Sequence, residues 1–119
     1  MSVLLRHAAA KERYEWPGDD FDRPLTKKGR RQAEELATVL GTDDVRRVVS
    51  SPYVRCVQTV EPLATALGLE VELDDRLAEG AGSAAQELLE EDGVVACTHG
   101  DVIYELTGRG LKKAEYVRV

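Results

Sequence analysis

Short apolar runs alternate along the chain with longer segments that have helical spacing. Most of the short runs are continuously apolar, which predicts buried strands of a parallel sheet. The final run differs, because Val117 and Val119 alternate with Tyr116 and Arg118, a pattern that suits a strand at the edge of a sheet. The predicted strands are 3–5, 46–50, 71–73, 94–98 and 116–119.

The first helical segment follows a polar stretch, residues 11–25, which we predict to be a long loop. Thr26 can cap a helix that ends at about Leu40, with Gly41 as its stop. The first turn of this helix carries positive charge where the helix dipole favours negative charge, from Lys27, Lys28, Arg30 and Arg31. These side chains form either a solvated face or a basic rim for a phosphorylated partner.

A second helix is predicted after the 46–50 strand. Ser51 can serve as its cap and Pro52 as its first residue, and a kink or break is expected near Pro62. Arg55 then lies in the opening turn, beside the carboxyl end of the strand. Because ligands gather at this edge of open α/β sheets, Arg55 is a candidate binding residue.

Two shorter helices complete the pattern. Ser83 and Gln86 form a capping box for the first, which ends at Gly93, and the second follows the 94–98 strand. Strands that alternate with helices predict an α/β fold. We expect three layers, α/β/α, with a mostly parallel central sheet covered on both faces.

The composition is that of an ordinary globular domain. Of the 119 residues, 43% are hydrophobic and 32% are charged, and we expect residues 1–119 to form a single domain. The net charge of −6 argues against nucleic-acid and acidic-membrane partners, because no positive field would attract a polyanion. No apolar stretch approaches the ~18 residues of a membrane span, and we expect a cytoplasmic location. Cys56 and Cys97 lack metal-ligand spacing and are expected to be free, buried thiols.

Both histidines of the chain follow a buried strand and precede small residues. His7 comes directly after Arg6, and parallel strands would bring this pair to the same sheet edge as His99 and Arg55. Guanidinium groups bind phosphate oxygens through paired hydrogen bonds, and an imidazole can attack phosphorus. Glu79, in a loop expected over this edge, could protonate a leaving oxygen. The residues therefore predict phosphoryl transfer.

A divalent metal site is the competing interpretation of this constellation. His7, His99, Asp101 and Glu79 are residue types that are common at such sites. Two arginines beside the same cavity would repel the ion, so we favour a phosphate site without a metal.

Four short motifs, in order along the whole chain, together resemble the histidine phosphatase superfamily, which has the phosphoglycerate-mutase-like fold. They are Leu5-Arg6-His7-Ala8, Ser50-Ser51-Pro52-Tyr53-Val54-Arg55, Leu77-Ala78-Glu79-Gly80 and Thr98-His99-Gly100-Asp101. Within that superfamily, the segment Asp22-Arg23-Pro24-Leu25-Thr26 resembles the SixA-type phosphohistidine phosphatases. It also resembles the phosphatase-like domain that is fused to Nudix hydrolases in some bacteria.

The resemblance implies hydrolysis of protein phosphohistidine or small phosphomonoesters through a phosphohistidine intermediate. His7 would be the nucleophile, Glu79 the proton donor and Arg23 a substrate contact. The phosphate pocket would be formed by Arg6, Arg55 and His99. No metal or organic cofactor would be needed, and the partner would be a phosphorylated protein or a small-molecule phosphate.

Two departures from the family pattern bear on the substrate. Ala8 stands where many members have glycine, and the link 108–113 is shorter than in the relatives, which predicts a shallow, open pocket. An open pocket favours a phosphate displayed on a protein, whereas a proton donor at Glu79 favours an alkyl phosphate. The alternative functions are a catalytically silent phosphate-binding module and a nucleotide phosphohydrolase that works with a Nudix partner. The sequence indicates no oligomeric state.

Overall fold

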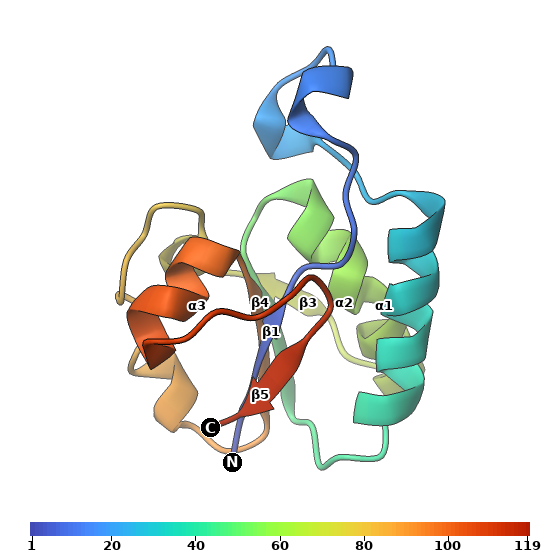
Figure 1. Cartoon of the computed structure of the whole chain (residues 1–119). Helices are drawn as coiled ribbons and strands as arrows, with labels where there is room; N and C mark the ends of the chain where they lie inside the picture. Colours follow the sequence, from blue (N-terminus) through green and yellow to red (C-terminus); the bar gives the residue numbers. More distant parts are fainter.

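The computed structural model describes residues 1–119 and contains a five-stranded sheet between two layers of helices (Figure 1). The strand order is β3-β2-β4-β1-β5. All neighbours are parallel except β5, which pairs antiparallel with β1 at the edge of the sheet. The predicted three-layer fold with a mostly parallel sheet is therefore confirmed. The strands are β1 Val3–Arg6, β2 Arg47–Ser50, β3 Val71–Leu73, β4 Val94–Thr98 and β5 Tyr116–Arg118.

The helices cover the two faces of the sheet unequally. Helices α1 (Lys27–Leu40) and α2 (Val54–Leu67) lie together on one face, and α3 (Gly100–Thr107) lies on the other (Figure 1). Side chains alternate along β1, so Val3 and Leu5 pack toward α1 and α2, whereas Leu4 packs toward α3. Two apolar clusters result, one on each side of the sheet.

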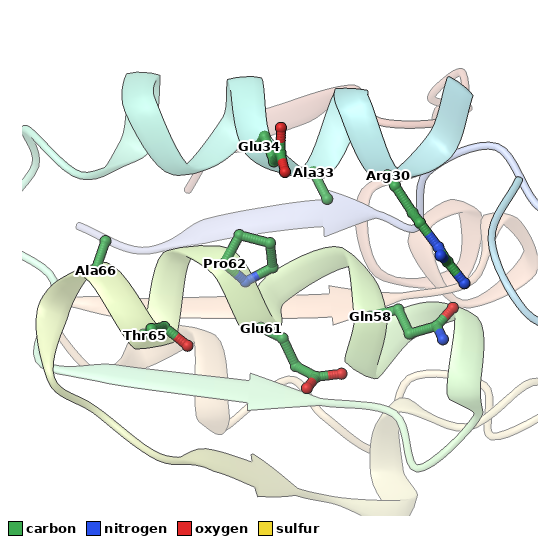
Figure 2. A pocket seen from close by; sticks show the side chains of 8 residues that line it. All are labelled: Arg30, Ala33, Glu34, Gln58, Glu61, Pro62, Thr65 and Ala66. Atoms are coloured by element: carbon green, nitrogen blue, oxygen red, sulfur yellow. The ribbon is translucent and has the colours of Figure 1, made fainter. Parts of the chain in front are cut away.

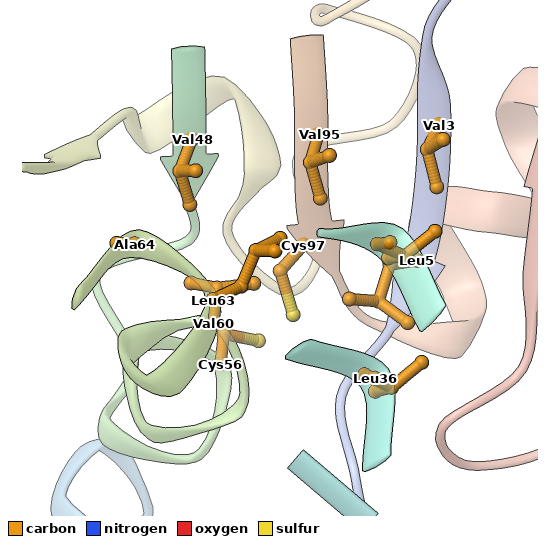
Figure 3. Close-up of a cluster of buried hydrophobic side chains, with 11 residues drawn as sticks. Val3, Leu5, Leu36, Val48, Cys56, Val60, Leu63, Ala64, Val95 and Cys97 are labelled. Atoms are coloured by element: carbon orange, nitrogen blue, oxygen red, sulfur yellow. The ribbon is translucent and has the colours of Figure 1, made fainter. Parts of the chain in front are cut away.

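The cluster beneath α1 and α2 contains both cysteines (Figure 3). Cys56 comes from α2 and Cys97 from β4, and both are buried, free thiols as predicted. The two residues are far apart in the sequence, but the sheet and the helix bring them into one cluster.

Helix α1 follows its predicted course. The Thr26 hydroxyl accepts a hydrogen bond from the Gly29 amide at 3.1 Å, which caps the helix, and Gly41 follows its last residue. A Cβ atom on Gly29 would lie 2.0 Å from the carbonyl oxygen of Ala9. Only glycine therefore lets α1 approach the segment that follows β1.

Helix α2 differs from the prediction at its start and at its proline. It begins at Val54 with Tyr53 in the N-cap position, so Ser51 is not the cap. It also continues through Pro62 without a break. Proline removes one hydrogen bond from the helix, but Leu63, directly after it, is anchored in the core and keeps the helix in place.

The helix predicted after Ser83 is not formed. The segment makes consecutive turns and the single 3₁₀ turn Leu88–Glu90, and Ser83 contributes a backbone carbonyl to Gln86 rather than a side-chain cap. Ala85 and Leu88 are still buried, as expected. A segment of this length between two glycines gains too few helical hydrogen bonds to offset the cost of starting a helix.

The chain termini and the 11–25 loop lie at opposite ends of the sheet. Ser2 and Val119 exchange two backbone hydrogen bonds of 2.9 and 2.8 Å, so the termini are neighbours (Figure 1). At the other end of the sheet, residues 11–25 form the predicted long loop, with two short 3₁₀ turns, Arg13–Glu15 and Asp20–Asp22. This loop is the blue projection at the top of Figure 1. None of the helices combines the length and the apolar character needed to cross a membrane.

Candidate active site

A cavity of about 330 Å³ lies at the carboxyl ends of β1 and β4. It contains every residue that the sequence places in the site: Arg6, His7, Arg23, Arg55, Glu79 and His99. Strand β1 delivers the first two, β4 delivers His99, the first turn of α2 delivers Arg55, and the loop after β3 delivers Glu79. The remaining lining residues are Glu12, Arg13, Tyr14, Gly100, Asp101 and Lys113.

A larger hollow of about 520 Å³ lies between α1 and α2 and holds neither histidine (Figure 2). Arg30 lines it, but the other basic residues of the first turn of α1 do not, and none of the four reaches the histidine cavity. All four are exposed. Their position agrees with a solvated face of the helix.

His7 is buried and held in one orientation. Its Nδ1 lies 2.8 Å from the carbonyl oxygen of Ala8, and because a carbonyl only accepts, Nδ1 carries the proton and Nε2 keeps its lone pair. Burial lowers the pKa of His7 to about 3, helped by the electrostatic effect of the neighbouring Arg55, His99 and Arg6 side chains and opposed by the hydrogen bond to Ala8. The ring is therefore neutral near pH 7, with Nε2 available as a nucleophile.

His99 is also buried, and its two ring nitrogens have different partners. Nε2 lies 2.8 Å from Ser51 Oγ and Nδ1 lies 3.4 Å from Arg55 Nη2. A guanidinium only donates, so Nδ1 accepts in this arrangement and Nε2 donates to the Ser51 hydroxyl. The Ser51 hydroxyl thus fixes the orientation of His99, and it also accepts from the Tyr53 amide at 3.3 Å.

The two imidazole rings lie close together in an edge-on arrangement. Their centroids are 5.5 Å apart, with an angle of 65° between the ring planes. Tyr53 packs edge-on against His99, with centroids 4.8 Å apart, and the Arg55 guanidinium lies 4.9 Å from the Tyr53 ring centroid. Packing on several sides therefore restricts His99 and Arg55 to single positions.

Arg6 and Arg55 retain hydrogen-bond donors that the protein does not satisfy. The Nε atoms of both are buried and have no hydrogen-bond partner. Other nitrogens of the two side chains do have partners: Arg6 Nη1 donates to the carbonyl oxygen of Leu111 at 2.7 Å, and Arg55 Nη1 donates to that of Asp20 at 2.9 Å. A buried donor without an acceptor is costly. The oxygens of a bound anion would supply the acceptors that these two Nε–H groups lack.

Gly100 gives the Arg6 side chain its space. A Cβ atom at this position would lie 3.1 Å from the Arg6 guanidinium carbon and 3.2 Å from its Nε. The residue after His99 therefore has to be small for Arg6 to keep its place. The backbone after His7 is fixed in a similar way, because Thr59 Oγ1 accepts from the Ala8 amide at 2.9 Å and Gln32 Oε1 from the Ala9 amide at 2.9 Å.

Ion pairs between two loops form the wall of the cavity. Glu79 Oε1 lies 2.7 Å from Arg13 Nη2, and Glu79 Oε2 lies 3.4 Å from Arg55 Nη2. Asp20 pairs with Arg55 at 3.3 Å and with Arg23 at 2.8 Å. These arginines, with the hydrogen bond from Arg23, hold the pKa of Asp20 below its usual value although burial acts in the opposite direction. Arg23 thus lines the cavity but is engaged by the 11–25 loop.

Asp101, at the start of α3, holds the loop that carries Glu79. Its Oδ2 accepts a hydrogen bond of 2.7 Å from the Gly80 amide. The metal interpretation gains no support from this arrangement, because the structure contains no group of three or more His, Cys, Asp or Glu residues that could hold a metal ion. Asp101 is instead a candidate for positioning Glu79.

The site also contains residues that the sequence analysis missed. Arg13, Tyr14 and Lys113 line the cavity, and Ser51 orients a histidine from outside it. Ser51 belongs to one of the four motifs and lies next to the end of a strand, so its sequence position already indicated a place near the site. Arg13 and Tyr14 come from a polar loop without periodicity, and nothing in the local sequence indicates that Arg13 contacts Glu79.

Comparison with known proteins agrees with this geometry. Residues 2–91 match the histidine phosphatase superfamily, branch 1. The chain is 38% identical over 110 residues to the 8-oxo-(d)GTP phosphatase of Mycolicibacterium smegmatis, a match that covers 85% of this chain and 34% of that protein. It is 33% identical over 87 residues to the 2,3-bisphosphoglycerate-dependent phosphoglycerate mutase of Thermoplasma acidophilum, covering 71% of this chain and 44% of the mutase.

A solved structure extends the comparison to the fold. A protein proposed to be the phosphohistidine phosphatase SixA, from Agrobacterium tumefaciens, aligns with a TM-score of 0.73 and 26% identity over 97% of this chain and 86% of that one. The chain therefore has nearly the extent of the SixA structure. It spans about a third of the M. smegmatis relative and less than half of the mutase.

Proposed function

Because the chain belongs to the histidine phosphatase superfamily, we propose that it is a phosphatase that hydrolyses phosphomonoesters or protein phosphohistidine through a phosphohistidine formed on His7. The observation that carries this proposal is the His7 ring. Its Nδ1 donates to Ala8, so a neutral Nε2 is left free in a cavity that Arg6 and Arg55 also line. No metal or organic cofactor is required.

In the first step on a phosphate ester, His7 Nε2 attacks phosphorus and the bond from phosphorus to the leaving oxygen breaks. On a phosphohistidine substrate the bond that breaks runs from phosphorus to the ring nitrogen of the substrate, which leaves in place of the oxygen. Arg6 and Arg55 hold the other phosphoryl oxygens and stabilise their charge, and His99 joins them by donating from Nδ1 once that nitrogen is protonated. Glu79, in its protonated form, gives its proton to the leaving oxygen. The products are the free alcohol, phosphohistidine on His7 and the Glu79 carboxylate.

In the second step, water attacks the phosphorus of the phosphohistidine and the bond from phosphorus to Nε2 breaks. Glu79 takes a proton from the attacking water and regains its acidic form. Inorganic phosphate leaves and His7 returns to its neutral state. Each step is a displacement at phosphorus with one proton transfer, so Glu79 serves in both directions.

A nucleotide is the second candidate substrate. The name of the M. smegmatis relative, an 8-oxo-(d)GTP phosphatase, supports this class, and the match covers only 34% of that protein. The chain would then act on a nucleotide together with a Nudix partner. Offering 8-oxo-dGTP and 8-oxo-dGDP to the chain alone and to the chain mixed with a Nudix hydrolase tests this candidate.

The central experiment is to trap the intermediate. The protein is mixed with a radiolabelled phosphate ester, quenched in alkali, and the label on protein is counted before and after mild acid, which cleaves the phosphorus–nitrogen bond of phosphohistidine. We expect acid-labile label on the wild type and none on His7→Gln, whose turnover falls at least about 10⁴-fold. His99→Gln is the matched control, because it removes the other histidine and keeps the nucleophile.

Two results would end the proposal. Turnover retained in His7→Gln would show that this residue is not the nucleophile. Tight binding of vanadate with no turnover of any ester, nucleotide or phosphohistidine peptide would identify a phosphate-binding module without catalysis.

A further inference from the structure

We propose that Arg13 selects substrates that carry a second anionic group close to the transferred phosphoryl group, and that this group draws Arg13 away from Glu79. The inference rests on the proposed function, since it requires that the cavity hydrolyse a phosphate ester. It concerns a residue of the 11–25 loop that the two-step reaction does not use.

Both oxygens of the Glu79 carboxyl group are engaged by guanidinium groups. Arg13 Nη2 lies 2.7 Å from Oε1, and Arg55 Nη2 lies 3.4 Å from Oε2. In this arrangement each carboxyl oxygen has a guanidinium partner that a leaving group or a water has to share or displace. Displacing one of the two arginines leaves an oxygen of Glu79 clear.

Arg13 is the arginine that can move. The Arg55 side chain is 1% exposed, belongs to α2 and is also bonded to the main chain and the carboxylate of Asp20. The Arg13 side chain is 63% exposed, belongs to a single 3₁₀ turn, and its other acidic partner, Asp20, is 3.6 Å away. An exposed ion pair of this kind is weak, so a competing anion can break it.

The charges of the cavity indicate what would compete. Its lining has five cationic side chains and three acidic ones. The buried Nε groups of Arg6 and Arg55 suit the transferred phosphoryl group, and Arg23 is taken by Asp20 and by the carbonyl oxygen of Lys11. Arg13 and the exposed Lys113 remain for another anion.

The position of Arg13 limits where that anion lies in the substrate. The Glu79 and Asp20 carboxylates each contact both Arg13 and Arg55, so the two arginines are close together and the second group has to be a few bonds from the phosphorus. A carboxylate or a second phosphate of a small molecule meets this condition. A phosphohistidine in a peptide does not, because the groups next to it are neutral amides.

The test uses two pairs of substrates that differ by one anionic group. The first pair is 3-phosphoglycerate and glycerol 3-phosphate, which share a three-carbon skeleton, and the second is ADP and AMP. We expect the wild type to prefer the member with the second anion at least about tenfold in kcat/KM, the effect of one charge-assisted hydrogen bond. In Arg13→Gln this ratio should fall about tenfold below its wild-type value, mainly through a higher KM for the doubly anionic substrate. A preference in only one pair identifies the second anion as a carboxylate or as a phosphate.

Arg46→Gln is the matched control. The Arg46 side chain is 65% exposed and pairs with Asp44 at 3.2 Å, as Arg13 pairs with Glu79, but it lies outside the cavity. The control should keep the wild-type ratio. Circular dichroism of both variants checks that the fold is retained.

The failures of the two proposals are distinguishable. If the wild type turns over the esters without preference, or if Arg13→Gln keeps the preference, the inference about Arg13 is wrong and the proposed function stands. If a phosphohistidine peptide is hydrolysed faster than every small substrate and Arg13→Gln leaves that rate unchanged, the substrate is a phosphoprotein and the inference also fails. If nothing is turned over, the proposed function itself fails.

Discussion

The cavity has a floor and a rim that are built in different ways. We call His7, His99, Arg6 and Arg55 the floor, and Arg13, Glu79 and Asp101 the rim. The floor residues come from strand ends and the first turn of α2, and both imidazoles are oriented by buried partners. The rim residues come from two loops and the exposed start of α3, and they are joined by a partly exposed ion pair and by one hydrogen bond from the Gly80 amide to the Asp101 carboxylate. Chemistry that needs fixed geometry therefore belongs to the floor, whereas the rim can change with the substrate.

After the loss of the nucleophile, the largest expected effect is at Arg55, the one floor residue that also contacts the rim. Arg55→Lys keeps the charge but loses the planar set of donors that contacts Asp20, Glu79 and His99. We expect kcat/KM for p-nitrophenyl phosphate to fall about 10²- to 10³-fold and vanadate affinity to weaken with it. Arg76→Lys, which changes an arginine paired with Asp74 outside the cavity, is the control. A loss of kcat/KM no larger than that of Arg76→Lys would show that Arg55 does not act with the other floor residues.

A second prediction uses pH to test whether burial keeps the floor residue His7 neutral. Burial lowers the pKa of His7 from 6.5 to about 3, so the unfolded chain binds a proton in this range that the folded protein does not. The free energy of unfolding should therefore fall as the pH drops from 6.5 toward 3, by up to about 1.4 kcal/mol per pH unit from this residue. Urea denaturation at a series of pH values should give a shallower fall for His7→Gln than for the wild type. Parallel curves would mean that burial does not hold His7 neutral.

The smallest expected effect is at the rim. Asp101→Ala removes the 2.7 Å hydrogen bond to the Gly80 amide and loosens the loop that carries Glu79. We expect kcat for an alkyl phosphate to fall about three- to tenfold, and kcat for p-nitrophenyl phosphate, whose leaving group needs no proton, by less than about twofold. Asp101→Asn, whose amide oxygen can still accept, should restore most of the activity. Equal losses on both substrates would point to a structural role instead.

Much of the fold follows from local pattern, since each strand and the two long helices are close to their predicted positions. The apolar run before Arg6 and the one before His99 each need burial on both faces, which only a central strand offers. The segment after Ser83 could not be predicted in this way. Its apolar residues have helical spacing, but whether a short helix forms depends on the competition between its few hydrogen bonds and the turns that its flanking glycines allow.

The floor of the site was predictable for the same reason. A residue at the carboxyl end of a parallel strand is placed by the sheet, so His7 and His99 could be brought together from their sequence positions alone. The rim could not, because the contact of Arg13 with Glu79 joins two irregular segments that are 66 positions apart in the sequence. Ser51 shows the same limit: its hydroxyl suits a helix cap and a histidine partner equally well, and only the packed structure decides between them.

The paired ends of the chain have a practical consequence. Ser2 and Val119 are hydrogen-bonded to each other at the side of the sheet opposite the histidines. A short linker could therefore join them, and new ends could be opened in an exposed turn such as the one at Gly108. Such a circular permutant would keep every strand neighbour and leave the cavity clear, and a surface tether at the original ends would present the cavity outward.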